Sequence, residues 1–221
     1  MGQSTNLVTF GRACLALLFL FVMVRGAVGT TERRDWAAAQ YVIKTTRVYS
    51  EPTAESRPFG RVFVATRLGV KDQKPGWLRV EIRGWHQEGA KRMLYALPGK
   101  RIKAALISKD TVEKIRPLDN VTDPDTNITW MGAAIEGWIV DDNVSPDLNT
   151  IWKSAWGLFS TRCTVCHQRR NPKKYTANQW VGLLKVMGPR TGLPKEQQHL
   201  ILKYLQNHAR DMEVEASSVK P

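Results

Sequence analysis

The sequence contains few cysteines, a minority of acidic residues and no long hydrophobic run. Its 221 residues include three cysteines, at positions 14, 163 and 166. A zinc ribbon needs a second pair of ligands, and beyond His167 only His199 and His208 follow the cysteine pair, with no further cysteine. The longest apolar run, residues 13–24, has 12 residues and is too short for a comfortable bilayer span. The cysteines therefore do not match a zinc-ribbon pattern, and the apolar run does not match a comfortable membrane span.

Two of the three cysteines belong to one pentapeptide, Cys163-Thr164-Val165-Cys166-His167. This C-x-x-C-H spacing is the attachment signature of a c-type haem, in which two thiols add to the haem vinyl groups and the adjacent histidine ligates the iron. A thioredoxin-like redox pair would open a helix after a strand and needs no trailing histidine. We predict one covalently attached haem c on Cys163 and Cys166, with His167 as an axial ligand.

The N-terminal residues 1–29 have the pattern of an export signal. Arg12 precedes the apolar run, and small residues follow it at positions 26–29. We predict cleavage of this signal, which would also remove Cys14, and a periplasmic mature protein. An uncleaved N-terminal membrane anchor is the alternative. In an oxidising compartment an isolated cysteine pair would form a disulfide, but the histidine beside this pair favours haem.

The remaining residues are predicted to form an α+β protein of two domains. Short stretches of alternating apolar and polar residues at 45–49, 60–64 and 77–82 indicate strands, whereas helical patterns follow residue 145. The β-domain resembles bacterial SH3-like barrels, with an insertion at roughly residues 85–130. The predicted order is an SH3-like small β-barrel at 30–140, a linker at 141–146, an all-α small c-type cytochrome domain at 147–210, and a disordered tail at 211–221.

The C-terminal domain also offers a second axial ligand. Thr176 and Gln179 have the spacing of a capping box that starts a helix, and Gly188-Pro189 ends it. This helix places Met187 on an apolar face about twenty residues after His167. We predict His167 and Met187 as the two iron ligands. His199, His208 and an open or water-bound site are the alternatives.

Several segments resemble the C-terminal monohaem domain of the pentahaem cytochromes of the trimethylamine-N-oxide reductase system. The similar segments are residues 156–159, 163–167, 175–180, 185–187, 189–191 and 203–209, with 83–90 and 94–102 upstream. The resemblance implies contact with, and electron transfer to, a periplasmic molybdenum reductase that acts on N- or S-oxides. Members of that family begin with a membrane-anchored tetrahaem module, and these 221 residues hold no second C-x-x-C-H motif. We therefore expect a separate upstream electron donor.

The charge of the chain favours an acidic partner. Residues 146–210 contain 11 Lys or Arg and two acidic residues, whereas residues 30–145 contain 19 and 15. A basic surface steers an acidic redox protein toward the haem edge. Nucleic acid is a poor alternative, since the chain has an export signal and no recognisable binding fold.

These observations predict an exported monohaem c-type cytochrome, an electron carrier rather than an enzyme. It would pass single electrons to or from a periplasmic oxidoreductase, with a molybdenum reductase as the candidate. The alternatives are a tightly bound haem subunit of such an oxidoreductase and a haem-based sensor or binding protein.

Overall fold

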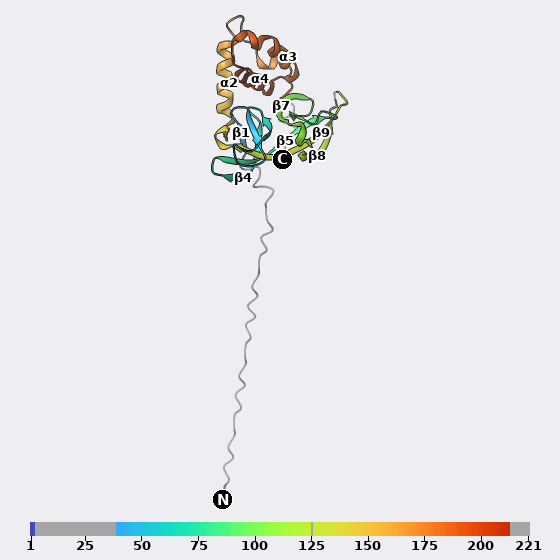
Figure 1. Cartoon of the computed structure of the whole chain (residues 1–221), viewed down its shortest axis with the longest axis vertical. Helices are drawn as coiled ribbons and strands as arrows, with labels where there is room; N and C mark the ends of the chain where they lie inside the picture. Colours follow the sequence, from blue (N-terminus) through green and yellow to red (C-terminus); the bar gives the residue numbers. More distant parts are fainter. Residues whose placement is uncertain (3–38, 125, 213–221) are drawn as a thin grey trace. The chain divides into compact units, whose positions relative to one another are not determined.

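The computed structural model describes residues 1–2, 39–124 and 126–212, which form a β-part followed by a helical part (Figure 1). The predicted signal segment lies outside the described residues from position 3 onward, and the predicted tail does so from position 213. No helix of the described ranges is long and apolar enough to cross a membrane.

The β-part is a single antiparallel sheet, in which ten strands fall within the described ranges. They are β1 (Ala39–Val42), β2 (Thr46–Tyr49), β3 (Pro58–Val62), β4 (Arg67–Lys74), β5 (Trp77–Gln87), β6 (Met93–Leu97), β7 (Lys100–Ile107), β8 (Arg116–Thr122), β9 (Thr129–Val140) and β10 (Val144–Ser145).

Six of these strands close into a small barrel in the order β5, β6, β7, β3, β2 and β9, with β9 pairing back onto β5. The β5–β9 pairing is the longest and runs from Trp77 opposite Val140 to Gln87 opposite Trp130. On its other edge β5 pairs with β4 over its first half and with β6 at Trp85. A barrel followed by helices confirms the predicted α+β class.

The segment expected as an insertion, roughly residues 85–130, is an integral part of the barrel. It supplies β6 and β7, together with the short helix η1 (Lys109–Lys114) and β8. β7 pairs with β3 and so satisfies an edge that would otherwise expose unpaired backbone groups. Closure of the barrel therefore depends on β6 and β7.

Alternating side chains fill the barrel interior. Gly137 on β9 shows how tightly the interior is packed, since a Cβ there would collide with Val48 and Phe59. The buried apolar residues of the β-part are Val42, Val48, Phe59, Val62, Leu68, Leu78, Val80, Ile82, Leu94, Ala105, Ile107, Ala133, Ile135 and Ile139.

The helical part contains α2 (Leu148–Arg162), α3 (Ala177–Met187) and α4 (Lys195–Asn207). Short 3-10 turns, η2 (Asp141–Asn143), η3 (Pro172–Lys174) and η4 (Gly188–Thr191), precede or join them. Asp147 caps α2, because its carboxylate accepts the backbone N–H of Asn149 at 2.9 Å. Ile151, Ala155 and Phe159 repeat every four residues and form the buried face of α2.

The start of α3 agrees with the predicted capping box. The hydroxyl of Thr176 accepts the backbone N–H of Gln179, and the Gln179 side chain accepts the backbone N–H of Thr176. The rings of Tyr175 and Trp180 pack edge to face, with centroids 5.0 Å apart. This arrangement fixes the direction of α3, whose last residue is Met187.

The β-part and the helical part share buried side chains and hydrogen bonds. Ile102 of β7 is buried in the cluster that also contains Phe159 and Trp180. The side-chain amide of Gln206 donates to the carbonyl oxygens of Arg101 and Ala177, at 3.1 and 3.2 Å. The β6–β7 hairpin is thus anchored to α3 and α4, which holds the helical part in place.

Candidate functional site

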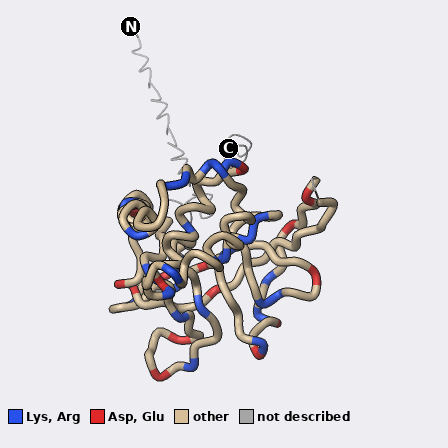
Figure 2. Tube along the Cα trace, turned by 90° about the horizontal axis from the view of Figure 1, so that it is seen from above, with Lys and Arg blue, Asp and Glu red and all other residues tan. Residues whose placement is uncertain are grey.

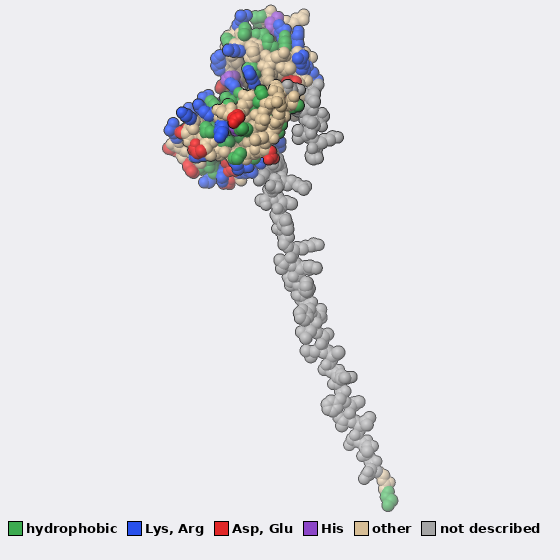
Figure 3. Space-filling view, turned by 90° about the vertical axis from the view of Figure 1, so that its right-hand side faces the viewer, with side chains coloured by type: hydrophobic (Ala, Val, Ile, Leu, Met, Phe, Trp, Pro, Cys, Tyr) green, Lys and Arg blue, Asp and Glu red, His purple; other side chains and the backbone are tan. Residues whose placement is uncertain are grey.

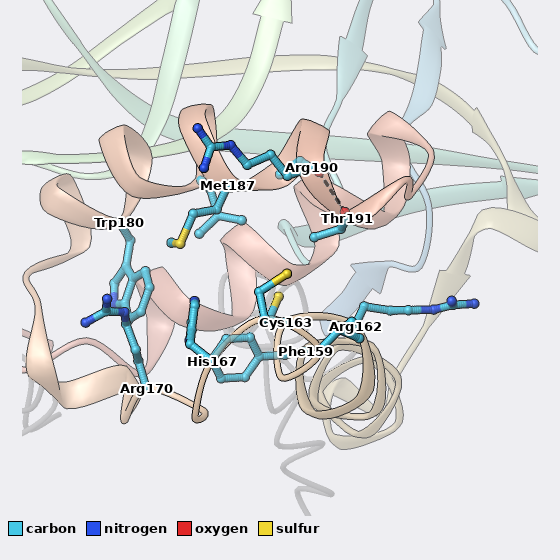
Figure 4. A pocket seen from close by; sticks show the side chains of 13 residues that line it. Phe159, Arg162, Cys163, His167, Arg170, Trp180, Met187, Arg190 and Thr191 are labelled. Carbon is cyan, nitrogen blue, oxygen red and sulfur yellow. Dashed lines mark hydrogen bonds between the residues drawn. The ribbon is translucent and has the colours of Figure 1, made fainter.

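The site is a cavity of about 420 Å³ in the helical part, between the end of α2 and the segment formed by α3 and η4 (Figure 4). This volume lies within the usual range for small-molecule and cofactor pockets. The lining residues are Phe159, Arg162, Cys163, Val165, Cys166, His167, Arg170, Trp180, Leu184, Met187, Gly188, Arg190 and Thr191.

Both cysteines of the C-x-x-C-H motif line this cavity as free thiols. Cys163 is the C-terminal cap of α2, where its backbone N–H donates to the carbonyl oxygen of Phe159 at 3.2 Å. The motif thus ends one helix and does not open another, which excludes the thioredoxin-like arrangement. Burial raises the pKa of the Cys163 thiol, and the Cys166 side chain is exposed.

His167 lies on the same wall of the cavity, in the turn after α2 (Figure 4). Its Nδ1 lies 2.8 Å from the carbonyl oxygen of Gln168 and donates a hydrogen bond to it. A protonated Nδ1 leaves the lone pair on Nε2, which is the arrangement of a metal-ligating histidine whose other nitrogen is hydrogen-bonded to backbone. The local structure therefore prepares His167 to bind a metal through Nε2.

Met187 reaches the cavity from the opposite side. Met187 is the last residue of α3 and is half-buried. In Figure 4 its side chain points into the cavity from above, and His167 points into it from below. The tertiary structure brings together all four residues predicted to bind the cofactor: Cys163, Cys166, His167 and Met187.

The two competing histidines lie elsewhere. His199 lines a smaller cavity near β7, together with Phe63 and Lys103, and burial lowers its pKa. His208 stacks on Tyr204, with ring centroids 4.1 Å apart, and its Nδ1 lies 2.7 Å from the Tyr204 carbonyl oxygen. Neither histidine lines the cavity that contains the cysteine pair.

The walls of the cavity are largely aromatic and aliphatic. Trp180 is almost fully buried, its Nε1 donates to the carbonyl oxygen of Pro172 at 2.9 Å, and its ring packs edge to face against Phe159. Leu184, one turn further along α3, is also buried. These side chains provide a dry, rigid surface for a flat hydrophobic group.

Three arginines also line the cavity, and the cofactor prediction did not include them. Arg170 donates from Nη1 to the Tyr175 hydroxyl at 2.9 Å, while its buried Nε has no hydrogen-bond partner. Arg162 ends α2, and Arg190 lies in η4. The surplus of basic residues in this segment was the available sequence signal, but only the tertiary structure shows which arginines line the cavity.

The residues present fit haem c. Two thiols and an imidazole occupy one wall, a thioether occupies the other, and the surface between them is apolar. The orphaned Nε of Arg170 suits a carboxylate of a porphyrin. In the described ranges, no group of three or more His, Cys, Asp or Glu side chains is placed to hold a metal ion.

A family model described as "TorC third cytochrome c domain" matches residues 35–144. This range covers most of the β-part and contains no cysteine, so the C-x-x-C-H motif lies outside the matched segment. No solved structure matches the chain.

Three curated relatives extend the comparison. The cytochrome c-type protein TorC of Escherichia coli (strain K12) is 33% identical over 153 residues, which are 69% of this chain and 39% of the relative. The cytochrome c-type protein TorY of Haemophilus influenzae is 33% identical over 131 residues, 59% of this chain and 36% of the relative. The cytochrome c-type protein TorY of Escherichia coli O157:H7 is 25% identical over 175 residues, which are 79% of this chain and 48% of the relative. The chain spans less than half the length of these relatives.

The site has the residues expected of a c-type haem centre, and the chain is similar to proteins named as c-type cytochromes. The particular resemblance predicted from the sequence is also confirmed. The chain is similar to the C-terminal region of the Tor-system cytochromes. The family model matches its β-part, and TorC and TorY match more than half of its length.

Proposed function

We propose that the chain is an exported monohaem c-type cytochrome that transfers single electrons in the periplasm. The observation that carries the proposal is the convergence of Cys163, Cys166, His167 and Met187 on one apolar cavity. The barrel, which we take to be SH3-like, positions the helical part through the contacts of Gln206.

Each side chain of the site has a distinct role in this proposal. The thiols of Cys163 and Cys166 would hold the porphyrin by thioether bonds, and His167 and Met187 would supply the iron ligands. When bound, haem c supplies an iron that alternates between the ferric and ferrous states. A thioether ligand raises the reduction potential relative to bis-histidine ligation. Trp180 and Leu184 exclude water from the site.

The surface around the cavity suits an acidic redox partner. Val165 lines the cavity and is 77% exposed, and Arg162 and Arg190 line the same cavity. Figure 2 shows basic positions throughout the described trace and acidic ones mainly in its outer loops. An apolar centre with a cationic rim binds an acidic surface and steers its approach.

The resemblance to Tor-system cytochromes supports a specific partner. We propose that the partner is a periplasmic molybdenum reductase acting on N- or S-oxides, and that a separate protein donates electrons to this chain. A membrane association would require that residues 1–29 remain uncleaved.

Extraction of the pigment tests the proposal. Protein exported in a cytochrome c-producing host should retain haem after denaturation and acid-acetone extraction, and should give a c-type pyridine haemochrome band. Cys163→Ser and Cys166→Ser should each remove one thioether bond and shift that band, whereas Val165→Ala, between them, should not. Complete release of haem from the wild-type protein would refute covalent attachment.

A further inference from the structure

A second cavity of about 430 Å³ lies at the outer surface of the barrel, away from the C-x-x-C-H motif. Its polar and charged lining includes Arg47 of β2, Arg61 of β3 and Arg92 just before β6, with Thr45, Ser108 and Glu196. The two cavities share no lining residue. The function proposed above does not use this second cavity.

Arg47 and Arg61 stand directly opposite each other on adjacent antiparallel strands. Their strand neighbours Val48 and Val62 are buried in the barrel, so the two arginines, which are exposed, project from its outer face. Like charges in this register destabilise a sheet. Neither guanidinium has an ion-pair partner among the described residues. Two like charges thus lie side by side on this face of the sheet without a direct ion pair.

The third arginine is held in place. Arg92 donates from Nε to the carbonyl oxygen of Ile107 at 3.0 Å, which leaves its terminal N–H groups for another acceptor. The hydroxyl of Thr45 is buried and has no hydrogen-bond partner. A buried hydroxyl without a partner costs free energy unless a bound group satisfies it.

We propose that this cavity binds a small ligand that carries about two negative charges on carboxylate or phosphate oxygens. Guanidinium groups form bidentate hydrogen bonds with such oxyanions. Three arginines against the single carboxylate of Glu196 leave two positive charges in the lining for the ligand to neutralise. The cavity volume is that of a small-molecule pocket.

Glu196 gives the site a further feature. It lies in the first turn of α4, whereas the arginines belong to the barrel, so a ligand would touch both parts of the protein. A carboxylate at the rim favours a ligand that also carries a hydroxyl or another hydrogen-bond donor. The face drawn in Figure 3 shows Lys and Arg side chains on both parts of the protein, so a matched surface control is needed.

Calorimetric titration of the haem-loaded protein at low ionic strength tests the proposal, with inorganic phosphate and succinate as probes and chloride as the ionic-strength control. We expect saturable one-to-one binding of at least one probe, and the preferred probe identifies the oxyanion. Arg47→Gln and Arg61→Gln should each weaken that binding about tenfold. The matched variant Arg210→Gln, an exposed arginine outside the cavity, should bind as the wild type does.

Thermal unfolding provides a second readout that needs no ligand. In chloride buffer Arg47→Gln should unfold at a higher temperature than wild type, because the repulsion with Arg61 is removed. The same variant should lose the stabilisation that the bound probe gives to wild type. Absence of saturable binding by both probes, or equal weakening by Arg210→Gln, would overturn the proposal. The haem spectrum should be the same in all variants, which separates this site from the electron-transfer function.

Discussion

His167 and Met187 face each other across one cavity, although twenty positions separate them in the sequence (Figure 4). The end of α2 places the imidazole, and the end of α3 places the thioether. Both helices pack against α4, and together they form a two-sided site that neither helix could form alone.

Met187→Leu preserves volume and removes the sulfur, so it tests the second axial ligand. We expect loss of the near-infrared charge-transfer band of thioether-ligated ferric haem, and a lower reduction potential measured by spectroelectrochemistry. His199→Ala and His208→Ala should leave the spectrum unchanged, because both residues lie outside the cavity. A spectral change in either histidine variant, with none in Met187→Leu, would assign the ligand to that histidine.

Electron transfer to an acidic partner should slow as salt increases. The Debye length falls from about 30 Å at 0.01 M to about 10 Å at 0.1 M, which shortens the range of steering. The double reversal Lys174→Glu with Lys185→Glu should lower the association rate in stopped-flow experiments and leave the reduction potential nearly unchanged. The double variant Lys91→Glu with Lys109→Glu reverses the same number of charges in the β-part and is the matched control. Rates that are indifferent to salt and to both reversals would favour a preformed complex.

The stability of the protein should depend on the protonation of Lys203. Burial lowers the pKa of this α4 side chain from 10.5 to about 7. Between pH 7 and 10.5 Lys203 is protonated in the unfolded chain and neutral in the folded protein. The free energy of unfolding therefore rises with pH in this range, by at most about 1.4 kcal/mol per pH unit. Below pH 7 both states are protonated and this gain is absent. Chemical denaturation across this range measures the slope.

Lys203→Met supplies the comparison for that titration. Methionine keeps an unbranched apolar stem but carries no charge, so the variant should be more stable than wild type at pH 6 and lack this component of the slope. A slope identical to that of wild type would show that Lys203 remains charged in the folded protein at neutral pH.

Gln206 should be needed to hold the helical part on the barrel. Gln206→Leu leaves the carbonyl oxygens of Arg101 and Ala177 without this buried donor. We expect a loss of about 1–3 kcal/mol in the free energy of unfolding, measured by urea denaturation. Gln197→Leu, on the same helix and without a comparable buried bond, should change stability much less. Equal effects of the two variants would mean that apolar packing alone joins the parts.

Local signals in the sequence predicted much of the site. The C-x-x-C-H spacing predicts covalent haem by its chemistry alone, and the Thr176–Gln179 capping box predicts the start of α3, which the structure confirms. The sequence is less informative at the start of α2. Ser145 before Pro146 has the pattern of a helix cap, but in the structure Asp147 caps α2 and Ser145 belongs to β10. When several neighbouring polar residues could each cap a helix, the sequence does not show which of them does.

The chain by itself therefore determined the C-x-x-C-H pattern, the start of α3 at its capping box, and the basic character of the C-terminal half. These features depend on residues that are adjacent or a few positions apart. The tertiary structure decided that β6 and β7 close the barrel, that Met187 rather than His199 or His208 shares the cavity of His167, and that Arg47, Arg61 and Arg92 converge. These contacts join residues far apart in the chain, so only the packed fold specifies them.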